Sequence, residues 1–154
     1  MLAPGSPAPA LRGPTDQADF DLAALRGKPV VVYFYPKDMT PGCTTEARDF
    51  RDLGPEFQAL GATVVGVSRD SADRHARFRS KEALEFPLVA DESGAIVEAW
   101  GVWAEKKLYG RTFMGIVRST FLVDAQGRIA RVWDKVKVKG HAAEVLAATR
   151  TLAD

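Results

Sequence analysis

The sequence predicts an α/β fold in which helices flank a mixed central sheet. The first observation is a pair of continuous apolar runs, residues 30–35 and 62–67, whose β-branched composition is typical of strands buried on both faces. The second is the helical pattern that follows each run, as a parallel β–α–β connection requires. The third is a pair of strand-like runs, residues 119–123 and 129–133, on either side of a short turn, which predicts an antiparallel hairpin. Parallel and antiparallel pairs in one chain predict a mixed sheet.

The first half of the chain divides into an arm, a strand and a helix. Residues 1–18 are rich in Pro, Gly and Ala, and we expect them to form an irregular N-terminal arm. After the strand at 30–35 comes a turn-rich segment, residues 36–42, and then a set of apolar residues spaced three or four apart, which predicts one buried helix face. These residues are Ala47, Phe50, Leu53, Phe57 and Leu60. Pro55 follows Gly54 within this pattern, so we expect a kink or a break there.

The second half continues the alternation of strands and helices. After the strand at 62–67, Asp70 or Ser71 is expected to cap a helix that runs to about Glu82. Residues 86–90 predict a short strand, residues 95–100 a helix, and the hairpin is followed by a last helix. The apolar stripe of that helix consists of Ala142, Val145, Leu146, Thr149 and Leu152. This order is that of the thioredoxin-like fold, and residues 1–154 are expected to form one domain.

Composition and charge exclude several classes of partner. The chain has 154 residues, of which 46% are hydrophobic, enough for a core that needs neither metal nor disulfide. The 21 Lys and Arg residues nearly balance 20 Asp and Glu residues, so nothing indicates nucleic acid or an anionic membrane surface as partner. Lys135, Lys137 and Lys139 alternate with valines, and we interpret them as the solvent-exposed face of a strand.

The sequence favours a cytoplasmic location. The first ten residues have no basic segment and no unbroken apolar segment, so they do not resemble a secretory signal. The longest strongly apolar run, residues 29–35, is far shorter than the roughly 20 residues of a membrane span. Cys43 is the single cysteine, so no internal disulfide can form, which favours a reducing compartment.

The position of Cys43 indicates a reactive thiol. A lone cysteine is ordinarily a small buried hydrophobic residue. Cys43, however, follows Thr-Pro-Gly after a buried strand and opens the predicted helix. This places its sulfur beside backbone N–H groups that have no helical acceptor, and at the positive end of the helix dipole. Both favour the thiolate, which is the nucleophilic form of the side chain.

The residues around Cys43 resemble a known family. Residues 36–46 read Pro-Lys-Asp-Met-Thr-Pro-Gly-Cys-Thr-Thr-Glu, which matches the peroxiredoxin pattern P-x-x-x-T-x-x-C. The resemblance continues through residues 65–70, 86–88, 109–111, 115–124 and 136–141. The chain resembles the peroxiredoxin Q subgroup, also called bacterioferritin comigratory protein, from about Gly5 to the C-terminus. This resemblance implies a thioredoxin-like fold of the peroxiredoxin type and antioxidant reduction of hydrogen peroxide and organic hydroperoxides, with no cofactor.

The resemblance also implies roles for three residues. Cys43 is the expected peroxidatic nucleophile, which attacks the peroxide and becomes a sulfenic acid. Thr40 is expected to hydrogen-bond the thiolate and the incoming peroxide, although its position also suits a helix cap. Arg118 matches the catalytic arginine, which favours the thiolate and polarises the O–O bond; taken alone, it could equally be a solvated strand residue.

Three further residues are implied as support for the site. The backbone N–H groups of Gly42 and Cys43 are expected to complete the set of donors, and Pro36 to form the pocket wall and shield the sulfur. Glu46 resembles the glutamate that holds the arginine in place. Its position in the first helical turn has a simpler explanation as well, because a carboxylate there interacts favourably with the helix dipole.

The chain departs from the subgroup at Arg48. Many members have a second, resolving cysteine at this position, five residues after the first. Without it we predict a one-cysteine cycle, in which an external thiol reduces the sulfenic acid. The candidates are thioredoxin, glutaredoxin, a low-molecular-weight thiol, or transiently Cys43 of a second chain; the resemblance favours a monomer or weak dimer. The same chemistry without efficient turnover would make the protein a peroxide sensor or redox interaction protein.

Other sites are disfavoured by spacing. A cysteine phosphatase requires an arginine six residues after the cysteine, where this chain has Asp49. A disulfide exchanger requires C-x-x-C, which one cysteine cannot supply. His75 and His141 are far apart and show no metal-ligand spacing, so we expect no metal site. An inert structural cysteine in a thioredoxin-fold interaction module remains the third, weakest alternative.

Overall fold

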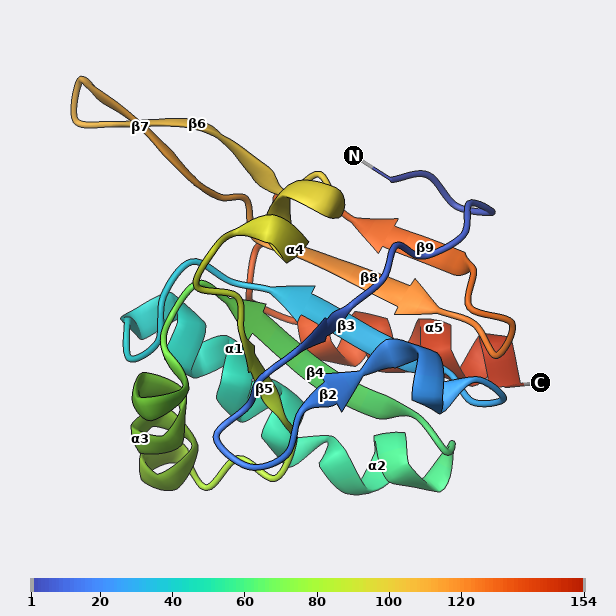
Figure 1. The fold of residues 1–154 in the computed structure, drawn as a ribbon. Helices are drawn as coiled ribbons and strands as arrows, with labels where there is room; N and C mark the ends of the chain where they lie inside the picture. The colour runs from blue at the N-terminus through green and yellow to red at the C-terminus, as the bar shows by residue number, and fades with distance from the viewer. Residues whose placement is uncertain (1, 154) are drawn as a thin grey trace.

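A five-stranded mixed sheet forms the centre of the molecule (Figure 1). The structure is a computed structural model and describes residues 2–153. In the strand order β5-β4-β3-β8-β9, β3 (Val30–Phe34) pairs in parallel with β4 (Thr63–Ser68) and antiparallel with β8 (Ser119–Val123). The edges are β5 (Leu88–Ala90) and β9 (Ile129–Trp133). The mixed sheet, its two buried runs and the C-terminal hairpin are therefore confirmed.

The helices follow the predicted patterns closely. α1 (Pro41–Asp52) ends before Leu53 and α2 (Gly54–Ala59) begins anew, which confirms the break expected at Pro55. The remaining helices are η1 (Leu22–Leu25), α3 (Ala72–Glu82), α4 (Ala95–Ala99) and α5 (His141–Ala153). Within the described part of the chain, no helix is both long and apolar enough to span a membrane.

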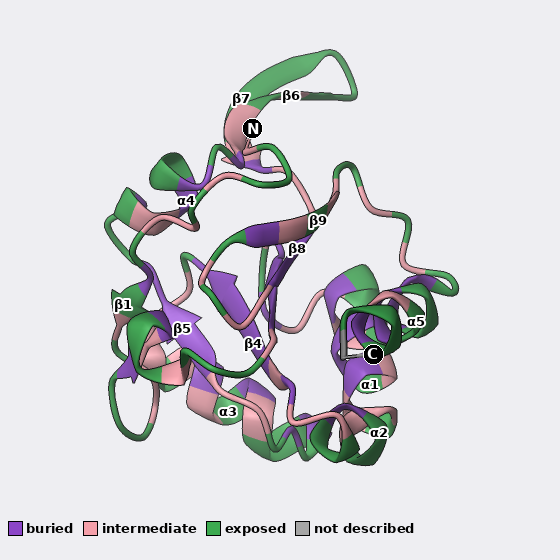
Figure 2. Ribbon diagram, turned by 90° about the vertical axis from the view of Figure 1, so that its right-hand side faces the viewer, coloured by how far each residue is buried: buried purple, intermediate pink, exposed green. Residues whose placement is uncertain are grey.

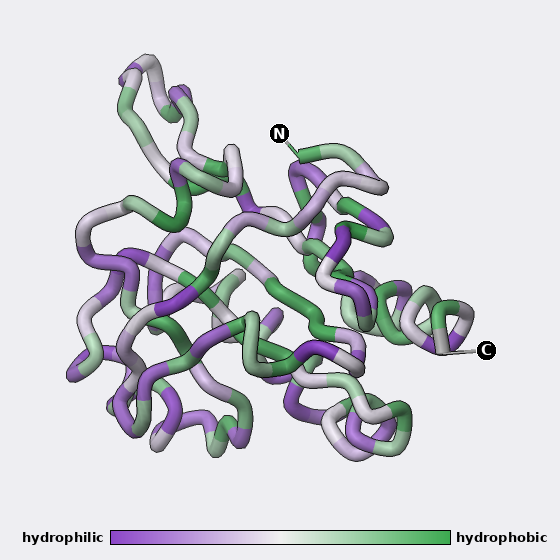
Figure 3. Tube along the Cα trace, turned by 45° about the vertical axis from the view of Figure 1, so that its right-hand side comes forward, coloured by the Kyte–Doolittle hydropathy of each residue, from purple (hydrophilic) through white to green (hydrophobic). Residues whose placement is uncertain are grey.

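Alternate side chains of the central strands build two apolar cores, one on each face of the sheet. Val32 and Phe34 belong to the core that also contains Trp100 and is covered by the N-terminal arm, η1 and α4. Tyr33 belongs to the other core, which is covered by α1, α2, α3 and α5 and includes Phe50. Figure 2 shows the buried strands between these layers, and in Figure 3 hydrophobic stretches of the trace run through the centre of the molecule. The sheet is thus buried on both faces.

One hairpin was not predicted from the sequence. β6 (Trp103–Leu108) pairs antiparallel with β7 (Arg111–Ile116), and both strands project from the body of the molecule (Figure 1). The turn residues Tyr109 and Gly110 have φ values of 52° and 75°. Positive φ at both positions is the backbone of a two-residue type I′ turn. Tyr109, at the tip, is 94% exposed.

Two expectations about irregular segments are corrected by the structure. The arm at 1–18 is not wholly irregular, because β1 (Arg12–Gly13) pairs antiparallel with β2 (Phe20–Asp21). Residues 134–140, which contain the three alternating lysines, form no strand. Lys135 has φ 49°, a left-handed conformation that ends the extended backbone of β9. The expected solvent exposure of Lys135, Lys137 and Lys139 is nevertheless confirmed.

The N-terminal arm crosses one face of the sheet and hydrogen-bonds at both of its edges (Figure 1). Beside β9, the Gly5 N–H donates to the Ile129 carbonyl at 2.7 Å, and the Ile129 N–H donates to the Ser6 carbonyl at 2.8 Å. Beside β5, the Ala90 N–H donates to the Pro14 carbonyl at 2.9 Å. The arm is therefore an integral part of the fold.

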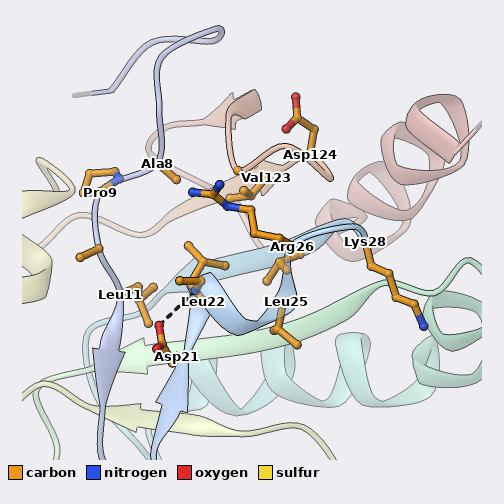
Figure 4. A pocket seen from close by; sticks show the side chains of 14 residues that line it. Ala8, Pro9, Leu11, Asp21, Leu22, Leu25, Arg26, Lys28, Val123 and Asp124 are labelled. Carbon is orange, nitrogen blue, oxygen red and sulfur yellow. Dashed lines mark hydrogen bonds between the residues drawn. The ribbon is translucent and has the colours of Figure 1, made fainter.

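A cavity of about 270 Å³ lies between the arm and η1 (Figure 4). Leu11, Leu22 and Val123 line its apolar part, and Arg26 and Asp124 belong to its polar part. Neither the single cysteine nor any other predicted site residue lines it. The predicted site lies elsewhere, where the chain leaves β3.

Candidate active site

Cys43 lies in the first turn of α1, immediately after the loop that leaves β3. Pro41 is the first helical residue, a position that suits proline because an N–H there would have no helical acceptor. The N–H groups that follow it in this turn are free of helical partners and carry the positive end of the helix dipole. The Cys43 side chain is only 2% exposed. A nucleophilic sulfur in this position is protected from bulk water while it stays close to backbone donors.

Arg118 brings a positive charge to this sulfur from a distant part of the sequence. It lies between β7 and β8. The first residue of β8, Ser119, pairs with the last residue of β3, Phe34, so Arg118 lies near the end of β3, where the chain continues into α1. The Nη2 atom donates to Cys43 Sγ at 3.3 Å, and Nη1 donates to Glu46 Oε1 at 2.6 Å. A Cβ atom at Gly42 would lie 3.2 Å from Nη2, so a glycine allows the guanidinium to approach this closely. The structure thus brings together four of the six predicted residues.

Glu46 is buried, and opposing effects act on its charge. Burial raises its pKa to about 7, although the ion pair with Arg118 lowers it. Its Oε2 atom and the Tyr33 hydroxyl are buried without hydrogen-bond partners among the described residues. Burial, and then the negative charge of Glu46, raise the pKa of Tyr33 well above its usual value, so the hydroxyl stays protonated. Near neutral pH, Glu46 is therefore divided between a charged and a neutral form.

Thr40 differs from its expected geometry. Its hydroxyl donates to the Lys37 carbonyl at 2.8 Å rather than to the thiol, and it makes no side-chain cap to α1. This bond closes a turn that contains Met39. The φ of Met39 is 64°, in the left-handed region that residues other than glycine rarely adopt. Pro36 opens this loop and lines a groove beside the site. The loop from Pro36 to Thr40 is thus held in a tight, locally strained turn.

The group that anchors this loop was not predicted from the sequence. Asp38 is fully buried and accepts a hydrogen bond from the Tyr35 hydroxyl at 2.5 Å, and its Oδ2 lies 2.6 Å from His75 Nδ1. The Nε2 atom of His75 donates to the Val89 carbonyl at 3.1 Å, since a carbonyl can only accept. The Asp38 N–H donates to Asp70 at 2.9 Å. These bonds tie the loop to α3 and β5.

Asp38, Asp70 and His75 also place possible metal-ligand atoms within 4.8 Å of one another. Each of these side chains already has partners within the protein. Asp70 accepts a hydrogen bond from the Ser68 hydroxyl at 2.6 Å and pairs with Arg74 at 3.0 Å. Because the cluster satisfies itself, we interpret it as an anchor for the loop.

Comparisons with known proteins identify the family to which the chain is similar. The sequence pattern of the AhpC/TSA family matches residues 4–132. Peroxiredoxin Bcp of Bacillus subtilis is 47% identical over 151 residues, which cover 97% of this chain and 96% of that protein. Peroxiredoxin Bcp of Xanthomonas campestris is 51% identical over 129 residues, covering 84% of this chain and 81% of that protein.

The fold is also similar to those of solved structures with related sequences. Bacterioferritin comigratory protein of Xanthomonas campestris, which has alkyl peroxide reduction activity, superposes with a TM-score of 0.91 at 42% identity and covers 99% of this chain and 100% of its own. Peroxidoxin BcpB of Mycobacterium tuberculosis superposes with a TM-score of 0.87 at 32% identity, covering 99% of both chains. The thioredoxin-like fold expected from the order of the elements is confirmed.

Proposed function

The chain belongs to the AhpC/TSA family and is a peroxiredoxin, and we propose that Cys43 is the residue that reduces the peroxide. The observation that carries this proposal is the 3.3 Å contact between Arg118 Nη2 and Cys43 Sγ. An arginine keeps its charge at all physiological pH values, so it favours the thiolate over the thiol. The thiolate attacks the terminal peroxide oxygen and the O–O bond breaks. Cys43 becomes a sulfenic acid, and the other oxygen leaves, with a proton, as water or an alcohol.

The neighbouring groups stabilise the charge that moves along the O–O bond. Arg118 and the first-turn N–H groups of Gly42 and Cys43 are donors aimed at the reacting oxygen atoms. Glu46 holds Arg118 in position through the 2.6 Å ion pair. Because these donors are fixed before the peroxide arrives, they need little reorganisation during the reaction.

Thr40 and Pro36 shape the space that the peroxide enters. The Thr40 hydroxyl gives its proton to the Lys37 carbonyl, so its free lone pairs accept a hydrogen bond from the peroxide. Pro36 forms part of the wall and limits the access of water to the sulfur. In this role Thr40 orients the substrate, rather than donating to the thiolate.

The cycle takes its reducing power from a thiol outside the chain. Arg48 stands five residues after Cys43 and pairs with Glu82 at 2.6 Å, and the sequence has no second cysteine. We propose thioredoxin, glutaredoxin or a low-molecular-weight thiol as the donor class, and the cytoplasm as the compartment that maintains it. The resemblance to the peroxiredoxin Q subgroup is the basis on which we propose a monomer or weak dimer.

Peroxide consumption with a panel of thiol reductants tests the proposal. Wild type is expected to consume hydrogen peroxide and an organic hydroperoxide, and Cys43→Ser to remain at the buffer background. Arg118→Lys keeps the charge but loses the planar fork, so we expect a rate at least about tenfold lower. Arg131→Lys, on the exposed face of β9, is the matched control and retains the wild-type rate. Oxidation of Cys43 that no thiol reverses would instead indicate a peroxide sensor.

A further inference from the structure

A groove of about 400 Å³ opens beside the active site, between its loop and the base of the β6–β7 hairpin. Lys37 belongs to the loop side, and Lys106 and Ile116 belong to the hairpin side. Both sides connect directly to predicted site residues. The Lys37 carbonyl accepts the Thr40 hydroxyl, and Arg118 follows Ile116 by two residues. The groove therefore lies beside the two segments that carry these site residues, although neither Cys43 nor Arg118 lines it.

Three cations line this groove: Lys37, Arg69 and Lys106. Among residues 2–153, none of them forms an ion pair with a carboxylate. The Lys106 ammonium donates to the Ile116 carbonyl at 2.7 Å, which holds it at the base of the hairpin. Burial, and then the positive charge of Arg118, lower the pKa of Lys106. The negative charge of Cys43 acts in the opposite direction and raises this pKa. An anion bound near Lys106 would add a compensating charge that no carboxylate among residues 2–153 supplies.

The remainder of the lining is mostly apolar. Trp103, Phe113 and Met114 contribute its hydrophobic surface, and the Arg69 guanidinium lies 4.7 Å from the centre of the Trp103 ring. Glu92 is the single carboxylate among the lining residues. A groove with three cations, one anion and apolar walls favours a small organic anion over a neutral or cationic molecule.

We propose that this groove binds the reducing thiol, and that this thiol is a small organic molecule with a fixed negative charge. The inference rests on the proposed function, because only an oxidised Cys43 requires a thiol. At 2% exposure, the sulfur is out of reach of a cysteine fixed on the surface of a folded protein, unless α1 opens. A small thiol held in the groove, beside the loop that precedes α1, needs a much smaller local opening to reach the sulfur.

The reaction in the groove conserves atoms and electrons. The sulfur of the small thiolate attacks the sulfenic sulfur of Cys43, an S–S bond forms, the S–O bond breaks, and the oxygen leaves as water after taking up a proton. A second thiolate then attacks the mixed disulfide, which releases Cys43 as a thiolate and the small thiol as its disulfide. Lys37 and Lys106 favour both attacks because they concentrate anions beside the sulfur.

Three thiols that share one ethyl skeleton and differ in charge provide the test. They are 2-mercaptoethanesulfonate, which is anionic, 2-mercaptoethanol, which is neutral, and cysteamine, which is cationic. Wild type is oxidised with one equivalent of hydrogen peroxide, and the sulfenic acid is verified by trapping and mass spectrometry. The rate at which each thiol removes the sulfenic acid is then measured and corrected for its thiolate fraction. We expect the anionic thiol to react about tenfold faster than the neutral one, and this advantage to shrink at high ionic strength.

Substitutions at two neighbouring residues of β6 test whether the groove causes the faster reaction of the anionic thiol. Lys106→Gln is expected to bring the ratio of the anionic to the neutral rate close to one, whereas Lys106→Arg, which keeps the charge, preserves it. Lys107→Gln is the matched control, because Lys107 is the next residue of β6, is exposed, and does not line the groove. Equal rates for the three thiols, or a ratio that Lys106→Gln leaves unchanged, would overturn the inference while the sulfenic acid still forms. Absence of any sulfenic acid would overturn the proposed function instead.

Discussion

The charge on Glu46 controls how Arg118 is held beside Cys43. When Glu46 is ionised, it forms a close ion pair with Nη1 of Arg118 at 2.6 Å. When it is protonated, its carboxyl group retains an acceptor but no longer attracts the guanidinium by charge. The pKa of about 7 places this change near neutral pH, and burial is its main cause. One residue is therefore expected to link the stability of the protein to the geometry of the proposed active site.

Glu46→Gln is predicted to remove a pH dependence of stability. The group titrates at 4.5 when it is unperturbed and at about 7 in the folded protein, so between these values the folded state binds more protons than the unfolded state. The free energy of unfolding of wild type consequently falls as the pH rises, by about 1–3 kcal/mol through this group. Urea denaturation at acidic and mildly alkaline pH is expected to show the variant gaining stability relative to wild type by that amount. A difference that stays constant with pH would contradict the prediction.

Cys43 is predicted to overoxidise under excess peroxide. Because the chain has no resolving thiol, the sulfenic acid persists until an external thiol arrives, and a second peroxide can convert it to the sulfinic acid. Mass spectrometry of the Cys43 peptide after titration with peroxide is expected to show the sulfinic form, and a thiol present from the start is expected to reduce its amount. Detection of sulfenic acid alone after prolonged excess would contradict this.

Prediction from sequence was uneven at the residue level. The convergence of Cys43, Glu46 and Arg118 could be anticipated, because the resemblance identifies all three. The anchor of Asp38 to His75 could not, since the two residues are 37 positions apart and only the fold brings the loop after β3 beside α3. The left-handed φ of Met39 could not be predicted either, because methionine has no preference for that conformation.

At the level of elements, the best-predicted segments were the continuous β-branched and aromatic runs of the central strands. β3 and β4 are short continuous apolar runs, and their length and β-branched composition favoured strands over buried helices. The β6–β7 hairpin was missed because its strands are largely exposed and carry charges rather than an apolar alternation. Its turn is Tyr-Gly, whereas the usual signal for a type I′ turn is Asn-Gly or Asp-Gly. The backbone hydrogen bonds between β6 and β7 hold this hairpin together, and such bonds cannot be predicted from amino-acid composition.

The end of α3 provides a prediction at this level. Ala83 follows the last helical residue with φ 53°, a left-handed conformation that glycine adopts without steric cost. Ala83→Gly is therefore expected to raise the free energy of unfolding by about 0.5–1 kcal/mol. Ala76→Gly, in the interior of the same helix, is the matched control and is expected to lower it by about 1 kcal/mol. Chemical denaturation measures both, and equal effects of the two substitutions would contradict the account.

At the level of the whole molecule, we propose that residues 1–154 unfold as one domain. The two apolar cores share the strands of one sheet, so loss of either core exposes the other. Trp100 lies in the core on the arm side, whereas most helical residues cover the opposite face. Tryptophan fluorescence reports on both cores, because Trp133 packs against the opposite one, whereas far-UV circular dichroism reports on the backbone of the helices and strands. We expect the two denaturation curves to coincide. Two separate transitions would contradict the proposal.

The N-terminal arm has a consequence for how molecules of this protein meet one another. The edge strands of a sheet offer unpaired N–H and C=O groups to which another chain can add, and such pairing leads to aggregation. By bonding to Ile129 beside β9 and to Ala90 beside β5, the arm occupies part of each edge. The arm supplies none of the proposed site residues, and its hydrogen bonds to the two edge strands are expected to protect the protein from aggregation by strand addition.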